Sequence, residues 1–357
     1  MNAPATARIA IVGCGAIVER SHAPALVHLA AAGRAHVTAL VDPDAARRSL
    51  LRRHFPGARS CADLGEIAPG EIDLALVASP ARFHAAQAQH LLAQGAHVLC
   101  EKPLASTVAD AEAMVAAART HGRVLAAGQF RRFFPALQLV RDYLAAESLG
   151  PLRRIDVREG GAFDWPAATP SFFDRRQAGG GVWLDVGAHV LDTLVWWLGE
   201  PLELVYADDA AGGLEANCRA RLRHANGATS HIFLSRDSAT PNRWRLEFER
   251  GEIVWCVGRT NELEVRLAGS SLWQIVRTEC ETPAGRRAGD GYDDVFVSQL
   301  ADVIDAVRHA RAPRVSGAEA LRALREVERG YATRQLLESP WLSHEEQAGV
   351  RAARDQS

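Results

Sequence analysis

The chain contains almost no lysine: one of its 41 basic residues, Lys102, is a lysine, and all the others are arginines. Because the two side chains are interchangeable at most exposed positions, this composition indicates a bias that replaces lysine wherever a generic cation suffices. They differ where a compact ammonium group or an adjustable pKa is needed. The one remaining lysine is therefore a candidate functional residue.

Cysteine pairs at metal-binding or redox spacing are also missing. The six cysteines are scattered and include no C-x-x-C pair, which is typical of reduced thiols in a cytosolic protein rather than of disulfides or a zinc site. The net charge of −2 offers no basic surface for nucleic acid or an anionic membrane. We therefore expect a cytoplasmic protein with no metal, no nucleic-acid partner and no membrane partner.

Long hydrophobic runs are absent as well. No run approaches the roughly 18 apolar residues that cross a bilayer, and the N-terminus shows no signal peptide. The stretch "VLDTLVWWLG" (190–199) is too short and contains Asp192, and its tryptophans, Trp196 and Trp197, are expected in the core. A length of 357 residues predicts two domains or one large one, and 48% hydrophobic content leaves ample core.

The first third of the chain alternates strand and helix patterns. Strands are predicted at 8–13, 36–42, 72–79, 96–103 and 123–128, and helices at 19–32, 43–54, 82–95 and 106–122. Repeated βα units of this kind indicate a parallel sheet with helices on both faces. The fold class is therefore α/β, with a Rossmann dinucleotide-binding domain over residues 1–128.

The pattern changes near residue 130. After a helix at about 134–147, strand patterns dominate, at 152–159, 202–208, 214–224, 228–235, 243–249, 252–257, 262–267 and 271–277. One helix interrupts them at 184–199, and two more follow at 291–310 and 317–337, the last opened by a capping box of Ser316 and Glu319. We therefore predict an α+β domain with a large, open, mostly antiparallel sheet over 129–315, and a closing helix (about 316–340) that packs back near the first domain.

A glycine loop follows the first predicted strand, in "IVGCGAIVERSHAPAL" (11–26). Gly13 and Gly15 allow a tight turn and close approach of a pyrophosphate to a helix N-terminus, beside Ala16 and Ile17. Val18 stands where G-x-G-x-x-G has its third glycine, and an ordinary strand-to-helix turn is the alternative for the loop alone. Its place in a βα unit favours dinucleotide binding.

Asp42 ends the second predicted strand, where an acid accepts hydrogen bonds from the adenine ribose and repels a 2′-phosphate. The cofactor is therefore predicted to be NAD rather than NADP. Arg47 and Arg48 lie close by and keep phosphate binding open, so Arg47 is included among the cofactor-binding candidates.

Lys102 stands in "VLCEKPLAS" (98–106), at the exit of the strand predicted at 96–103. Ligands of open α/β sheets bind outside the carboxyl ends of the strands. The glycine loop, "SPARFH" (79–84) and "EKP" (101–103) are therefore expected to line one crevice. The alternative is a surface lysine that escaped replacement.

Three motifs in this order resemble the glucose-fructose oxidoreductase / inositol dehydrogenase (Gfo/Idh/MocA) family: Gly-Cys-Gly, "EKP" and "AGGGVWLDVGAH" (178–189). The resemblance runs through most of the chain and implies an N-terminal Rossmann domain, a C-terminal domain with an open antiparallel sheet, and NAD(P)-dependent oxidation or reduction of sugars and polyols. It also implies that Lys102 hydrogen-bonds the reacting oxygen, that His189 is the acid/base, and that Asp185 binds substrate. Glu101 and Pro103 would shape the turn that faces the cofactor.

The chemistry of these residues fits those roles. Asp185 and His189 are four residues apart at the start of a predicted helix, so they share one face. An imidazole suits proton transfer near neutral pH, and an ammonium stabilises a developing alkoxide. A desolvated lysine can also share a proton, which arginine cannot do. A buried structural histidine is the alternative for His189.

Further candidates rest on the resemblance. "SPARFH" resembles the family's threonine-proline-asparagine turn, with Ser79 and Ala81 replacing two of its residues, and Ser79, Pro80 and His84 are predicted near the cofactor. His84 can equally be a helix-face residue, and His22 either approaches the cofactor or packs in its helix. The predicted substrate side includes Arg131, Phe163, Trp165, Arg175 and Arg176, whereas Arg132 is expected to be solvated. The pair Arg175 and Arg176 suits a carboxylate or phosphate, with surface salt bridging as the alternative.

The predicted function is hydride transfer between NAD and a secondary alcohol or ketone of a sugar, cyclic polyol or nucleotide-linked sugar. Two alternatives use the same scaffold: an NAD-dependent glycoside hydrolase or lyase that oxidises its substrate transiently, and a non-catalytic ligand sensor. An open sheet needs its exposed face covered, and the family associates through that sheet, so a homodimer or homotetramer is expected.

Overall fold

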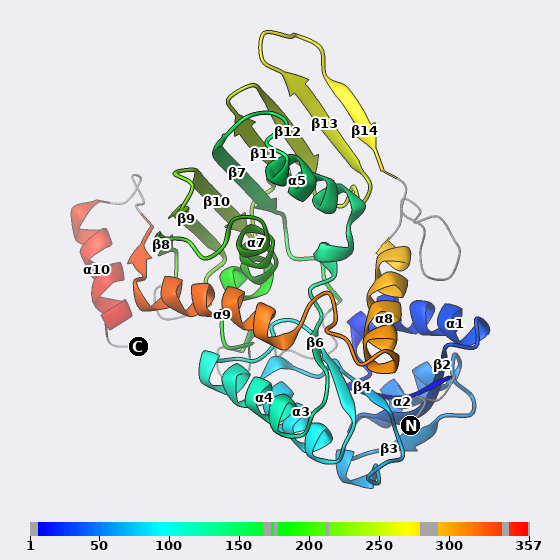
Figure 1. Ribbon diagram of the computed structural model, residues 1–357. Helices are drawn as coiled ribbons and strands as arrows, with labels where there is room; N and C mark the ends of the chain where they lie inside the picture. The colour runs from blue at the N-terminus through cyan, green and yellow to red at the C-terminus, as the bar shows by residue number, and fades with distance from the viewer. Residues whose placement is uncertain are drawn as a thin grey trace. The chain divides into compact units, whose positions relative to one another are not determined.

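The computed structural model describes residues 6–166, 173–174, 178–210, 214–278, 292–337 and 343–355. The chain forms two compact units (Figure 1). Among the described residues, the first unit consists mainly of 6–138 and 292–321. The second consists mainly of 139–165, 178–210, 214–277, 322–337 and 343–355.

A six-stranded sheet forms the centre of the first unit. Its strands are β1 (Ala7–Val12), β2 (Ala35–Val41), β3 (Arg59–Cys61), β4 (Leu74–Val77), β5 (His97–Cys100) and β6 (Leu125–Ala127). All neighbours pair in parallel, in the order β3-β2-β1-β4-β5-β6. This is the doubly wound order of dinucleotide-binding folds, so the predicted Rossmann domain is confirmed.

Helices connect these strands. They are α1 (Ala23–Ala31), α2 (Ala45–Arg52), α3 (His84–Ala93) and α4 (Val108–Thr120), and α8 (Tyr292–Arg308), from later in the chain, packs against α1. Shorter turns of helix are η1 (Val18–His22), η2 (Leu64–Glu66), η3 (Ala81–Phe83) and η4 (Phe130–Phe133). Asp44 caps α2 and Thr107 caps α4 through side chains that accept from backbone N–H groups.

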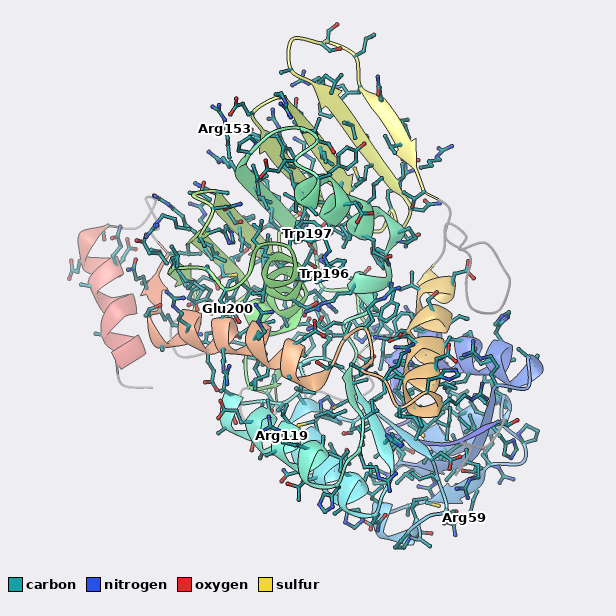
Figure 2. All side chains as sticks on the ribbon, viewed as in Figure 1. Arg59, Arg119, Arg153, Trp196, Trp197 and Glu200 are labelled. Atoms are coloured by element: carbon teal, nitrogen blue, oxygen red, sulfur yellow. The ribbon has the colours of Figure 1, made fainter. Side chains whose placement is uncertain are left out.

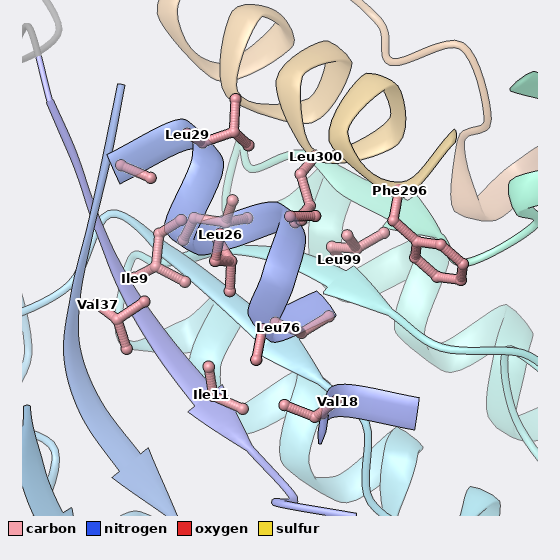
Figure 3. Close-up of a cluster of buried hydrophobic side chains, with 14 of the residues drawn as sticks. Ile9, Ile11, Val18, Leu26, Leu29, Val37, Leu76, Leu99, Phe296 and Leu300 are labelled. Atoms are coloured by element: carbon pink, nitrogen blue, oxygen red, sulfur yellow. The ribbon is translucent and has the colours of Figure 1, made fainter. Parts of the chain in front are cut away.

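The core of the first unit lies where α1 and α8 pack on the sheet. Leu26 and Leu29 of α1 face Leu300 of α8 and the strand residues Ile9 and Ile11, all fully buried (Figure 3). Because the side chains of α8 complete this core, residues 292–308 belong to the first unit, whereas the sequence pattern places them in the second domain.

A nine-stranded sheet forms the second unit. Its strands are β7 (Leu152–Gly160), β8 (Glu203–Asp208), β9 (Asn217–Arg223), β10 (Thr229–Ser235), β11 (Arg243–Phe248), β12 (Gly251–Cys256), β13 (Glu262–Leu267), β14 (Gln274–Arg277) and β15 (Gln335–Leu336). The order is β14-β13-β12-β11-β7-β10-β9-β8-β15. Pairing is antiparallel except for β7 with β10 and β8 with β15, which confirms the predicted mostly antiparallel sheet.

The two faces of this sheet differ. Along β9, Cys218, Ala220 and Leu222 are buried, and Arg219 and Arg221 between them are exposed. The period of two shows that one face is covered and the other carries charge. The helix α7 (Val182–Leu198) packs on β9 and β10.

Three further helices complete the description: α5 (Pro135–Ala145), α9 (Gly317–Ala332) and α10 (His344–Asp355). The capping box predicted at Ser316 and Glu319 is confirmed by its reciprocal hydrogen bonds of 3.1 and 3.3 Å. The short strands β3 and β15 and the helix α10 were not predicted. Within the described residues, no helix is long and apolar enough to cross a membrane.

Candidate active site

The glycine loop after β1 is shaped by close backbone contact. Gly13 has φ +92°, and a Cβ atom there would lie 2.5 Å from the backbone nitrogen of Ser79, so only glycine fits. A Cβ at Gly15 would meet nothing within 4 Å, and the Gly15 carbonyl accepts hydrogen bonds from Val18 and Glu19. Ala16 is buried and Ile17 half-buried at the start of η1. The loop therefore leaves open space beside a helix N-terminus, where a phosphate would be bound.

Asp42 ties this loop to the end of β2. Its Oδ2 accepts from the Cys14 backbone N–H at 2.8 Å, and its Oδ1 accepts from the Asp44 N–H at 2.9 Å. Arg48 bonds the Asp42 carbonyl and, at 2.8 Å, the Ser60 hydroxyl. Arg47 lies 3.6 Å from Glu19. The carboxylate thus lies at the strand end predicted for it, and both neighbouring arginines contact other groups of the protein.

Buried groups hold the turn that contains Lys102. Glu101, which is 5% exposed, places Oε1 2.7 Å from the imidazole Nε2 of buried His22 and accepts at Oε2 from the Lys102 backbone N–H at 3.0 Å. A Cβ at Gly128 would lie 2.8 Å from the Glu101 carboxyl carbon. His22 therefore supports the turn indirectly, through its contact with Glu101. Lys102 itself is half-buried and follows β5 by two residues.

His84 joins two predicted loops. Its Nε2 is 2.7 Å from the Ser79 carbonyl, and its Nδ1 is 2.9 Å from the Pro103 carbonyl. Burial lowers the pKa of His84, although two carbonyl partners favour the charged ring. Ser79 also donates its hydroxyl to Gln87 at 2.6 Å, and Pro80 is exposed. Both His84 ring nitrogens are thus engaged by backbone, so this histidine holds the Ser79 and Pro103 turns.

Two arginines on η4 are buried. Arg131 is 7% exposed, and Arg132, which the sequence predicted to be solvated, is 1% exposed. That prediction is wrong because Arg132 ion-pairs with Glu319 at 3.0 Å, at the start of α9. A buried arginine needs such a partner, and the partner lies 187 positions away along the chain.

In the second unit, α7 carries both predicted residues of the glycine motif. Asp185 lies in its first turn, and its N–H donates to the Gly181 carbonyl at 3.1 Å. His189 follows one turn later, is 7% exposed, and accepts from the Thr193 hydroxyl through its carbonyl at 2.9 Å. The predicted spacing on one helix face is therefore present.

Glu215 anchors the start of α7. Its Oε1 accepts from the backbone N–H groups of Gly181 and Trp183, both at 3.0 Å, and from the Tyr331 hydroxyl at 2.6 Å. A Cβ at Gly180 would lie 2.3 Å from the Tyr331 oxygen, and one at Gly181 would lie 2.1 Å from the Glu215 carbonyl oxygen. Gly180 and Gly181 of the motif are therefore required by this anchor. Burial raises the pKa of Glu215.

Arg236 contacts Asp185 directly. Its Nη2 donates to Asp185 Oδ2 at 2.8 Å, and its guanidinium carbon lies 5.5 Å from the centre of the Phe163 ring. Neither Arg236 nor Glu215 was predicted from the sequence. Each is a single charged residue next to the end of a strand, Glu215 before β9 and Arg236 after β10, and belongs to no motif. Only the folded structure brings the two residues to α7.

The remaining candidates are placed as follows. Trp165 is half-buried, whereas Arg175 and Arg176 lie outside the described residues. Trp196 and Trp197 lie at the end of α7 (Figure 2), half-buried rather than fully in the core. Arg141 of α5 lies over the Trp196 ring, and Trp197 meets Trp244 edge-on at 5.6 Å. The described residues hold no cluster of three histidine, cysteine, aspartate or glutamate side chains that would bind a metal ion.

Comparison with known proteins gives curated relatives that match part of the chain. The rhizopine catabolism protein MocA of Rhizobium meliloti is 32% identical over 199 residues, which cover 54% of this chain and 57% of that protein. The myo-inositol dehydrogenase Hyg17 of Streptomyces leeuwenhoekii is 32% identical over 203 residues, which cover 57% and 59%. The chain thus spans little more than half the length of these curated relatives.

The fold has solved counterparts. A levoglucosan dehydrogenase in complex with NADH and levoglucosan matches with a TM-score of 0.81 at 21% identity, covering 92% of this chain and 97% of that one. At this identity the match shows the fold alone.

Family models match two consecutive parts of the sequence. Residues 7–129 match the oxidoreductase family with an NAD-binding Rossmann fold, and residues 137–254 match the GFO/IDH/MocA C-terminal domain. With the Rossmann strand order, the mostly antiparallel second sheet and the three motifs in place, the chain belongs to the GFO/IDH/MocA oxidoreductase family.

Proposed function

We propose that this protein is an NAD(P)-dependent dehydrogenase or reductase acting on a secondary alcohol or ketone of a sugar, cyclic polyol or nucleotide-linked sugar. The observation that carries the proposal is the fixed position of the lone lysine. Lys102 follows the last residue of β5, Cys100, by two positions in a Rossmann sheet, and the side chain of buried Glu101 accepts from its backbone N–H. A lysine held at the carboxyl end of such a strand is placed for chemistry on a ligand.

The chain fits a dinucleotide cofactor. Gly13 lets the loop pack closely on the Ser79 backbone, and Gly15 has open space beside it just before η1, next to Ala16 and Ile17. When bound, the nicotinamide supplies the chemistry of hydride exchange. Asp42 would accept hydrogen bonds from the adenine ribose, and Ser79, Pro80 and Glu101 would form the turns near the nicotinamide.

NAD is proposed over NADP. The Asp42 carboxylate disfavours a 2′-phosphate, and the two arginines that would attract one contact protein groups: Arg48 bonds the Asp42 carbonyl and Ser60, and Arg47 lies near Glu19. A phosphate at this position would have to draw one of them away.

The proton chemistry falls to three side chains. Lys102 stabilises negative charge on the reacting oxygen. His189 takes the hydroxyl proton during oxidation and returns it during reduction. Asp185 accepts a hydrogen bond from a neighbouring substrate hydroxyl, one helical turn from His189. Arg131, Trp165 and Arg176 are proposed on the substrate side.

A homodimer or homotetramer is part of the proposal. The exposed face of the second sheet carries charged side chains, and Leu272, Trp273 and Ile275 at its β14 edge are exposed. Light scattering at micromolar concentration tests this expectation, and a monomer would contradict it.

A cytoplasmic protein is also part of the proposal. It is supported by the free thiols of five cysteines: Cys14, Cys61, Cys100, Cys218 and Cys256.

A panel of sugars, cyclic polyols and nucleotide-linked sugars, assayed for net formation of NADH or consumption of NADH, tests the proposed function. A dehydrogenase forms NADH in proportion to the ketone produced. Product without net NADH would favour the hydrolase or lyase alternative. Binding of NAD and of a panel member without any product would favour the sensor.

A further inference from the structure

His22 and Glu101 form a buried pair next to the turn that carries Lys102. The side chain of His22 is fully buried and that of Glu101 is 7% exposed, and the imidazole Nε2 lies 2.7 Å from Glu101 Oε1. The other carboxylate oxygen, Oε2, accepts from the Lys102 backbone N–H at 3.0 Å. One carboxylate therefore joins His22 to the backbone of Lys102.

Both side chains of the pair are held by close packing. His22 meets Phe296 of α8 edge-on, with ring centres 4.9 Å apart, and Phe296 belongs to the hydrophobic core of the first unit (Figure 3). The Glu101 backbone N–H donates to the Val77 carbonyl at 2.8 Å, and a Cβ atom at Gly128 would lie 2.8 Å from the Glu101 carboxyl carbon. The carboxylate therefore has little room to change its orientation.

The hydrogen bonds assign the proton of the His22 imidazole. A carboxylate oxygen accepts, so Nε2 is the nitrogen that donates to Glu101. Nδ1 is buried and has no hydrogen-bond partner among the described residues, and a proton there would be a buried donor without an acceptor. The imidazole is therefore assigned as an Nε2–H donor to Glu101.

The glycine loop places this donor. Val18 and Glu19 donate their backbone N–H groups to the Gly15 carbonyl, both at 3.1 Å, and η1 ends at His22. η1 is a π-helical turn, in which the Ala23 N–H donates to the Val18 carbonyl. Such turns carry an extra residue relative to an α-helix and are frequent at functional sites. One histidine thus connects the loop proposed for the pyrophosphate with the turn of the lysine.

We infer that His22 is a positioning residue, which keeps Lys102 in place for the reacting oxygen by fixing Glu101, the acceptor of the Lys102 backbone N–H. The inference rests on the proposed function, in which Lys102 contacts the reacting oxygen. It adds a residue to which that function assigns no role, and this residue acts only through Glu101.

The composition of the chain supplies a direct probe. Because Lys102 is the only lysine among 357 residues, protein made with ¹⁵N-labelled lysine has one labelled backbone amide, the amide that donates to Glu101. NMR measures the position of this signal and its rate of hydrogen exchange, since a hydrogen-bonded amide exchanges only when the bond opens. Neither measurement needs a substrate.

The variants separate the donor from the volume of the side chain. His22→Leu fills similar space without a donor, and His22→Gln places its amide nitrogen near the position of Nε2. The amide nitrogen of His22→Asn corresponds to Nδ1 and is too far back to reach Glu101, so this variant replaces His22→Leu if the latter does not fold.

The matched control is His224→Leu in the second unit. His224 is 1% exposed, its Nε2 lies 2.7 Å from the Ser230 hydroxyl, and its Nδ1 is also without a partner among the described residues. The control therefore removes a histidine of the same burial and bonding pattern. Thermal unfolding is measured for every variant.

In His22→Leu the Lys102 amide signal should move, and its hydrogen exchange should become about tenfold faster, the scale of one lost hydrogen bond to a charged group. For an active panel member kcat should fall about 10- to 100-fold, because the lysine loses its orientation. KM and NAD affinity should change little. His22→Gln should restore the amide signal and kcat, and His224→Leu should match wild type in both. The losses of His22→Leu and Glu101→Gln should not add in the double variant, because both break the same connection.

An unchanged Lys102 amide in His22→Leu overturns the inference. So does a changed amide with full turnover, which leaves the proposed function standing, and so does a His22→Gln protein that behaves like His22→Leu. If wild type turns over no panel member, the proposed function fails instead, and the Lys102 amide alone decides the inference. A change in His22→Leu that His22→Gln reverses then supports it, and any other result overturns it.

Discussion

Carboxylates hold the candidate functional residues in both compact units, but their partners come from different distances along the chain. In the first unit, Glu101 binds the backbone of the next residue, Lys102, and Asp42 binds Cys14 at the end of the neighbouring strand. In the second, Glu215 binds Gly181 from 34 positions away and Tyr331 from 116 positions away. A parallel sheet aligns its strand ends, so local motifs suffice there. A helix lying on an antiparallel sheet has to be fixed by side chains from distant segments.

The difference has an energetic side. Around Glu215 the second unit buries a second carboxylate, Asp208, which ion-pairs with Arg334 at 2.7 Å. Burial raises the pKa of both carboxyl groups. Buried charges of this kind are costly to leave unpaired. We therefore expect substitutions around α7 to affect folding strongly, whereas substitutions at the loops of the first unit mainly affect binding and catalysis.

Glu215→Ala should have the largest effect, a loss of about 3–5 kcal/mol in the free energy of unfolding. The change leaves two backbone N–H groups and the Tyr331 hydroxyl without their acceptor. Chemical denaturation measures the loss. Glu215→Gln keeps an acceptor for the same donors and should lose less, and Glu203→Ala, at an exposed carboxylate of β8, is the control. A Glu215→Ala protein as stable as wild type would show that α7 needs no anchor.

Glu215 also makes the free energy of unfolding depend on pH. Because burial raises the pKa of Glu215, the folded state binds its proton more tightly than the unfolded chain does. This contribution to stability is present at low pH and is lost as the pH rises above the ordinary glutamate value. Glu215→Gln should remove it.

Lys102→Arg comes next, with an expected loss of about 10²–10³ in kcat. Arginine keeps the charge but is larger, planar and never deprotonated. Steady-state kinetics on an active panel member measure the loss, and NAD affinity should change little, because the backbone contacts of the turn remain.

His189→Ala should cost a similar factor and remove the limb of the kcat/KM profile near neutral pH. Lys102→Arg and His189→Ala together test the comparison of the two units, since Lys102 belongs to the first unit and His189 to the second. Near-full turnover of Lys102→Arg would make the lone lysine an accident of composition, and the proposed mechanism would be wrong.

Asp42→Ala should have a smaller effect, narrowing the preference for NAD over NADP by about tenfold, the scale of one hydrogen bond to a charged group. The variant removes the ribose acceptor, the repulsion of a 2′-phosphate and the bond to the Cys14 N–H. Fluorescence titration with both cofactors measures the ratio. Tighter binding of NADP than NAD by wild type would overturn the assignment of the cofactor.

Glu200→Gln should have the smallest effect, below about 1 kcal/mol, because the pair of Glu200 with Arg322 of α9 is well exposed. The hydrogen bond to Arg322 lowers the pKa of Glu200 to about 2. The pH dependence is therefore opposite to that of Glu215. The contribution of Glu200 to folding stability is present at pH values above its ordinary pKa and is lost as the pH falls toward 2. Thermal unfolding between pH 2 and 7 checks it.

Much of the fold could be predicted from residue patterns. Alternating βα units indicated the parallel sheet, and strand patterns joined by turns indicated the second sheet. The predicted helix 19–32 begins instead with the π-helical turn η1, before Pro24. The strands β3 and β15 are too short for a pattern to show. Boundaries of this kind depend on packing, which residue spacing does not record.

The sequence by itself determined the residues whose partners are local: the glycine loop and Asp42 at the ends of adjacent parallel strands, Glu101 beside Lys102, and Asp185 one helical turn before His189. Tertiary structure alone decided that Arg132 is buried against Glu319, that His84 and His22 support the turns around Lys102, and that Glu215 and Arg236 hold α7. The physical reason is that a buried polar group is defined by its partner, and apart from those of His84 these partners lie 32 to 187 positions away, where no spacing rule links them.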